Sequence, residues 1–122
     1  MAKKILIIED EELLCNLLQR KLGEEGYQVS VAKDGVEGIE MMKEIKPDLI
    51  LLDIVMPNKN GFEVMDEMQA DDELKSIPII VISNSGQPVE IDKAKESGAN
   101  DWLIKTEFDP QEVIEKVKKQ IG

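Results

Sequence analysis

Four short apolar runs of this chain each lead directly to a polar residue with useful chemistry. ILII is followed by Glu9 and Asp10, LILL by Asp53, IIVI by Ser83 and WLI by Lys105. Carboxylates bind hard divalent cations and act as nucleophiles, whereas a hydroxyl and an ammonium bind the oxygens of an anion. Wholly apolar runs of this length are typical of parallel strands, because both faces of such strands are buried. Open parallel sheets bind ligands at the carboxyl ends of their strands, so we predict one functional site there.

The elements that must position these residues alternate between strand and helix five times. The expected strands are residues 5–8, 27–32, 48–52, 77–82 and 102–104. Each is followed by a helical pattern, and no repeat or interdomain linker interrupts the series. Such alternation predicts a single α/β domain over residues 1–122, a flavodoxin-like three-layer sandwich with five helices. Its doubly wound, five-stranded parallel sheet should have the order 2-1-3-4-5, which places Asp10 and Asp53 at the switch point between strands 1 and 3.

The helices are marked by apolar stripes and by capping residues. After the first strand, leucines recur at helical spacing, at Leu13, Leu14, Leu17, Leu18 and Leu22. The second, third and last helices begin with a capping residue three positions before a glutamate: Asp34 and Glu37, Asn60 and Glu63, Asp109 and Glu112. A weaker helix is expected over 88–97.

The composition excludes several classes of function. The 122 residues include 15 Lys plus Arg against 26 Asp plus Glu, a net charge of -11, which argues against nucleic acid or an anionic membrane as a direct partner. The apolar stretch behind the N-terminus is too short for a signal peptide or a membrane span. The one cysteine, Cys15, lies among leucines, is expected to be an inert thiol, and fits a cytoplasmic location. Because histidine is absent, imidazole-based zinc sites and Ser-His catalysis are excluded.

The carboxylates favour a metal site. Three carboxylates close together repel one another, so Glu9, Asp10 and Asp53 should take up protons or a cation. Hard oxygen ligands favour Mg²⁺, with Mn²⁺ as the other option. Alternatively, Glu9 and Asp10 belong to a solvated acidic run that starts the next helix, and the two interpretations carry about equal weight. Asp53 is harder to explain in that way, because aspartate is disfavoured at the end of an apolar strand.

Lys105 and Ser83 extend this chemistry to an anionic ligand. Each has an ordinary alternative, since Lys105 could form a simple ion pair and Ser83 could cap a turn. Together with the carboxylates at equivalent strand ends, they favour a phosphoryl site in which Asp53 is the nucleophile and forms an acyl phosphate. A phosphohistidine donor would have to come from another protein, because this chain has no histidine. No glycine-rich nucleotide-binding motif is present.

At this point the sequence resembles the receiver domain of two-component response regulators, of the stand-alone, chemotaxis-regulator-like kind. The most specific stretch is LLDIVMPNKNG, residues 51–61, in which a Met-Pro pair and a glycine follow the phosphoacceptor. The resemblance implies that Asp53 accepts phosphate from a histidine kinase or a histidine phosphotransfer protein. It also implies Mg²⁺ ligation by Asp10, Asp53 and the backbone carbonyl of Val55, with Glu9 acting mostly through water.

The same resemblance implies a switch. Ser83 would move toward the phosphoryl group, which Lys105 contacts, and Trp102 would change rotamer. The altered surface would be the face made by the fourth helix, the fifth strand and the fifth helix, where a downstream protein would bind. Such a protein is not an enzyme, apart from promoting its own aspartyl phosphorylation and dephosphorylation. A core role for Trp102 is the equally weighted alternative.

Some positions depart from the family's pattern. Thr106 follows Lys105 where a proline, often after a cis bond, is usual, so the Lys105-Thr106 bond is either trans in a reshaped loop or strained. Val55 is apolar where a polar side chain is common. These departures leave open a pseudo-receiver, a binding module of the same fold that is never phosphorylated. A metal-dependent phosphatase is a weaker alternative, because Val55 cannot supply its second acid.

Overall fold

The computed structural model describes residues 2–56, 58–84, 86–107 and 109–122, so Pro57 of the Met-Pro pair lies outside the described residues. Five parallel strands form one sheet in the order β2-β1-β3-β4-β5. The strands are β1 (Lys4–Ile8), β2 (Gln28–Ala32), β3 (Leu49–Asp53), β4 (Ile79–Ser83) and β5 (Asp101–Ile104). The predicted fold class and strand order are confirmed.

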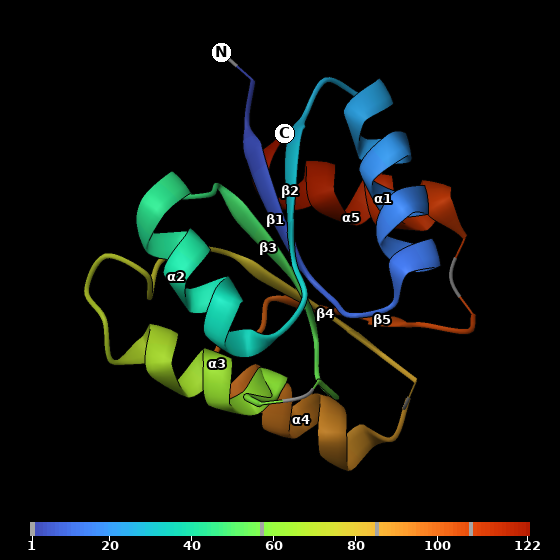
Figure 1. Cartoon of the computed structure of the whole chain (residues 1–122). Helices are drawn as coiled ribbons and strands as arrows, with labels where there is room; N and C mark the ends of the chain where they lie inside the picture. Colours follow the sequence, from blue (N-terminus) through green and yellow to red (C-terminus); the bar gives the residue numbers. More distant parts are fainter. Residues whose placement is uncertain (1, 57, 85, 108) are drawn as a thin grey trace.

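Five helices cover the two faces of the sheet. They are α1 (Glu12–Glu24), α2 (Gly35–Ile45), α3 (Gly61–Gln69), α4 (Pro88–Glu96) and α5 (Pro110–Ile121). Figure 1 shows α1 and α5 on one side of the sheet and α2, α3 and α4 on the other. In the part of the chain that the structure describes, no helix is long and apolar enough to cross a membrane.

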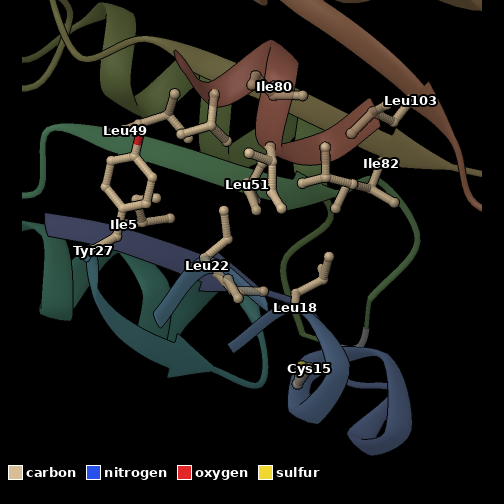
Figure 2. Packing of buried hydrophobic residues seen from close by; sticks show 14 of the residues in the cluster. Ile5, Cys15, Leu18, Leu22, Tyr27, Leu49, Leu51, Ile80, Ile82 and Leu103 are labelled. Atoms are coloured by element: carbon tan, nitrogen blue, oxygen red, sulfur yellow. The ribbon is translucent and has the colours of Figure 1, made fainter. Parts of the chain in front are cut away.

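The core is divided by the sheet, because successive side chains of a strand point to opposite faces. On β3, Leu49 and Leu51 pack toward α1 and α5, in the cluster shown in Figure 2. Ile50 and Leu52 pack toward α2, α3 and α4. All four side chains are fully buried, which explains why β3 is apolar on both faces up to its last residue.

The predicted caps are confirmed, whereas one apolar residue lies elsewhere than expected. The side chains of Asp34, Asn60 and Asp109 each accept a hydrogen bond from the backbone N–H three residues on. Leu13, predicted in the leucine stripe of α1, is 81% exposed. The buried stripe of this helix runs through Leu14, Leu18 and Leu22, and a residue one position before it is rotated about 100° away from the core.

Tyr27 provides a test of the packing beneath α1. Its ring lies among the buried residues in Figure 2, and its hydroxyl is buried without a hydrogen-bond partner in the described part of the chain. A buried polar group without a partner costs about 1–3 kcal/mol. We therefore expect Tyr27→Phe to raise the free energy of unfolding by about 1 kcal/mol in urea denaturation. A loss of stability would instead show that a buried water satisfies the hydroxyl.

Candidate functional site

The strand register brings the predicted residues to one edge of the sheet. Ile8 of β1 pairs with Leu52, Asp53 pairs with Ile82, and Ser83 pairs with Ile104. The residues at the carboxyl ends of these strands therefore lie level with one another along the strand direction. The backbone N–H of Lys105 continues the ladder by donating to the Ser83 carbonyl at 2.6 Å. Neighbouring parallel strands thus bring together groups that lie far apart in the sequence.

Lys105 is the centre of an ion cluster at this edge. Its Nζ lies 2.8 Å from Glu9 Oε1, 3.2 Å from Glu11 Oε2 and 3.5 Å from Asp53 Oδ2. The lysine side chain starts at the edge strand β5 and reaches across to the loop after β1. The pairing with Asp53 that the sequence allowed is present, but the closest partner is Glu9.

The two acidic residues that follow β1 differ in how deeply they are buried. Glu9 is only 1% exposed, and its second carboxylate oxygen accepts a hydrogen bond from the Glu11 backbone N–H at 2.9 Å. Asp10 is exposed. The alternative that both belong to a solvated run is therefore wrong for Glu9, because β1 lies inside the sheet and its end is covered by the loops of its neighbours.

The buried acids hold their protons more tightly than free carboxylic acids do. Burial raises the pKa of Glu9 to about 7, against the opposing effect of the Lys105 ammonium. Burial also raises the pKa of Asp53, while Lys105 and the Val55 backbone N–H, which donates to Asp53 Oδ1 at 3.3 Å, act to lower it. Desolvated carboxylates of this kind gain from a cation that replaces their lost water.

The donor atoms are arranged as a metal would require. Glu9, Asp10 and Asp53 each offer a carboxylate oxygen, and these oxygens lie within 4.8 Å of one another. Oxygen ligands without thiolate or imidazole suit Mg²⁺ and Mn²⁺. The acidic cluster therefore fits a hard divalent cation.

Lys105 remains positively charged in this setting. Burial alone would lower the pKa of its ammonium, but the bond to Glu9 and the charges of Asp53 and Glu9 raise that pKa above its ordinary value. The Lys105-Thr106 bond is trans, since no cis peptide bond occurs in the described residues. The trans alternative is therefore the correct one, and Lys105 reaches the site without a following proline.

A cavity of about 290 Å³ opens beside Asp53. Ser83 and Lys105 line it together with Asp53 and Val55. Ser83 is 6% exposed, whereas Val55 is 78% exposed at the outer edge. A pocket that joins a carboxylate, a hydroxyl and an ammonium can hold a phosphoryl-sized anion once a cation balances the surrounding acids.

A family model described as the response regulator receiver domain matches residues 5–118. This chain belongs to that family.

Relatives and solved structures agree with this assignment. The DNA-binding response regulator MtrA of Mycolicibacterium paratuberculosis is 31% identical over 121 residues, which are 99% of this chain and 52% of that protein. The receiver domain thus spans about half the length of the curated relatives it matches. A structure of the Vibrio cholerae chemotaxis protein CheY4 matches with a TM-score of 0.92 at 26% identity, covering 99% of this chain and 100% of that one. The Mn²⁺-bound form of the response regulator Rcp1 matches with a TM-score of 0.80 at 27% identity, covering 96% of this chain and 90% of that one.

Trp102 of the receiver domain is half-buried against the cluster on the α2, α3 and α4 side. It also lines a cavity of about 240 Å³ with Ile91, Ile104, Glu107 and Glu112. The indole therefore lies between the core and the surface formed by α4, β5 and α5. This position is compatible with both roles that the sequence left open.

Two acidic residues beside Asp53 and Lys105 were not predicted from the sequence. Glu11 contacts Lys105, and Glu90 of α4 lines the cavity beside Asp53. The acidic run after β1 was a signal for Glu11, whereas no sequence pattern marks Glu90. Cys15 is buried as expected, and burial raises the pKa of its thiol to about 11, so the reactive thiolate is scarce at neutral pH.

Proposed function

We propose that this receiver domain is a phosphoacceptor switch in which Asp53 takes a phosphoryl group from a phosphohistidine of a partner protein. The observation that carries the proposal is the cluster of Asp53 with Glu9, Asp10 and Lys105 at one sheet edge. A carboxylate oxygen of Asp53 would attack the phosphorus, the P–N bond would break, and the imidazole nitrogen would leave with the electron pair and take up a proton. The three acids could hold a cation, and the ammonium could contact the phosphoryl oxygens during that transfer.

Mg²⁺ is the cation we assign to the acidic cluster, with Mn²⁺ as an alternative that the Mn²⁺-bound Rcp1 structure supports. Asp10, Asp53 and the Val55 carbonyl would hold it, and Glu9 would act through water. When bound, the ion supplies positive charge that offsets the repulsion between Asp53 and the phosphoryl oxygens. The chain's own contribution is the Lys105 ammonium, which would contact those oxygens, and the Ser83 hydroxyl, which would move toward them.

The proposed partners follow from this chemistry. A histidine kinase or a histidine phosphotransfer protein would donate the phosphoryl group. The response would be read on the face of α4, β5 and α5, where Trp102 lines a cavity, and a downstream protein would bind there. The name of MtrA describes a DNA-binding protein about twice as long, and we expect this acidic domain itself not to bind nucleic acid. A cytoplasmic location is part of the same proposal.

Phosphorylation of Asp53 is tested by intact mass after incubation with Mg²⁺ and a small acyl phosphate. We expect one phosphoryl adduct on the wild-type chain and none on Asp53→Asn, because the amide is not a nucleophile. Asp66→Asn, which changes an exposed aspartate of α3, is the matched control and should be modified like the wild type. An adduct on Asp53→Asn would contradict the assigned acceptor. Absence of an adduct in the wild type, with a partner kinase as well, would favour the pseudo-receiver.

A further inference from the structure

The Lys105 ammonium has three protons, and three carboxylates surround it. Its Nζ is 2.8 Å from Glu9 and 3.2 Å from Glu11, but 3.5 Å from Asp53. The Lys105 ammonium thus lies closer to Glu9 and Glu11 than to Asp53, the proposed phosphoacceptor. A phosphoryl group on Asp53 can bind the Lys105 ammonium more closely only if the contact of Lys105 with Glu9 or with Glu11 weakens.

Glu11 is the partner that Lys105 can leave at the least cost. Its side chain is 56% exposed, whereas those of Glu9 and Asp53 are 0% and 5% exposed. An exposed carboxylate regains water when an ammonium moves away, but a buried one is left uncompensated. Glu9 is also held in place by the backbone N–H of Glu11. The contact between Lys105 and Glu11 is therefore the adjustable one.

We propose that Glu11 is a positioning residue that draws the Lys105 ammonium toward the outer edge of the site and competes for it with the phosphoryl group on Asp53. This inference rests on the proposed function. The contact limits how readily Lys105 reaches the phosphoryl oxygens, so losing it accelerates phosphoryl uptake. Because Glu11 lines the same cavity as Asp53, no movement of the backbone is needed for the exchange.

The test compares rates of phosphoryl uptake, by intact mass with Mg²⁺ and a small acyl phosphate, for the wild type, Glu11→Gln and Glu12→Gln. Glu12 is the next residue, at the start of α1, is exposed, and makes no ion pair with Lys105 among the described residues, so its substitution removes the same charge from a neighbouring position. We expect Glu11→Gln to react about three- to tenfold faster than the wild type, and Glu12→Gln to stay within about twofold.

A double-mutant cycle shows whether Glu11 acts through Lys105. In a Lys105→Gln background, the acceleration by Glu11→Gln should fall to about that of Glu12→Gln. Equal acceleration with and without Lys105 would overturn the inference, because direct repulsion of the donor persists without the ammonium. A Glu11→Gln rate no higher than that of Glu12→Gln would overturn it as well. Either result on a phosphorylated wild type leaves the proposed function standing, whereas a wild type that gains no adduct, with a partner kinase as well, overturns both.

Discussion

In the absence of metal, the receiver domain should become less stable as the pH rises from about 5 to about 8, by up to about 3 kcal/mol. Burial raises the pKa of Glu9 from 4.5 to about 7 in the folded chain. Between those values the folded chain keeps a proton that the unfolded chain has released. The stabilisation is therefore complete below about pH 4.5 and is lost as the pH rises through about 7.

The other titrating groups leave this sign unchanged. The pKa of Asp53 is also raised, chiefly by burial, and acts in the same direction. Asp101 is partly buried, which raises its pKa, but the Lys116 ammonium at 2.8 Å and the Trp102 backbone N–H lower it overall. A lowered pKa of Asp101 changes stability only at pH values below the ordinary pKa of aspartate. Those values lie below the pH range in which Glu9 titrates.

Urea denaturation with a chelator, at several pH values across this window, measures the effect. Glu9→Gln is the control, because an uncharged amide should largely remove the pH dependence and make the metal-free chain more stable at the upper end. Mg²⁺ needs deprotonated carboxylates, so it should stabilise the wild type more at about pH 8 than at about pH 6. Metal-free stability that increases steadily across the window would show that Glu9 is ionised in the folded chain, contrary to this expectation.

Gly61→Ala should strongly destabilise the chain, because the added methyl group would meet backbone atoms. A Cβ at Gly61 would lie 2.6 Å from the backbone oxygen of Asp53 and 2.8 Å from the Cα of Ile54. Both atoms belong to the backbone at the end of β3, where a rotamer change cannot relieve the contact. We expect a loss of about 2–3 kcal/mol in the free energy of unfolding, as for overpacked cores.

The same substitution should impair the site. Gly61 donates its backbone N–H to the Ile54 carbonyl at 2.9 Å, so α3 begins directly against the segment that carries Asp53. Displacement of that segment should slow phosphoryl uptake about tenfold or more, because the proposed transfer depends on the position of the Asp53 carboxylate. The fold is monitored by urea denaturation and the uptake by intact mass.

Gly23 supplies the matched control. It lies within α1, and a Cβ there would meet nothing within 4 Å. Gly23→Ala should therefore stabilise the chain by up to about 1 kcal/mol through helix propensity and leave phosphoryl uptake unchanged. If Gly61→Ala matched the wild type in both measurements, the backbone after Asp53 would have to be more adaptable than this packing allows.

Much of this protein could be predicted from its sequence, because the relevant patterns are local. Apolar runs with polar residues at their ends predicted parallel strands, and the right-handed connection rule reduced the possible strand orders to a few that include the observed one. Since parallel strands end at a common edge, the meeting of Glu9, Asp53 and Lys105 followed from topology. The capping residues were also correctly predicted, since a cap depends on residues three positions apart.

Only the tertiary structure decided which groups touch and how deeply each is buried. Lys105 has a long flexible side chain, and its preference for Glu9 and Glu11 over Asp53 depends on the relative heights of three loops. Glu9 and Asp10 are adjacent acids, yet one is buried and the other exposed, because consecutive side chains leave a strand end in different directions. Patterns along a chain determine which edge carries the chemistry, but distances and desolvation at that edge arise from packing between segments far apart in sequence.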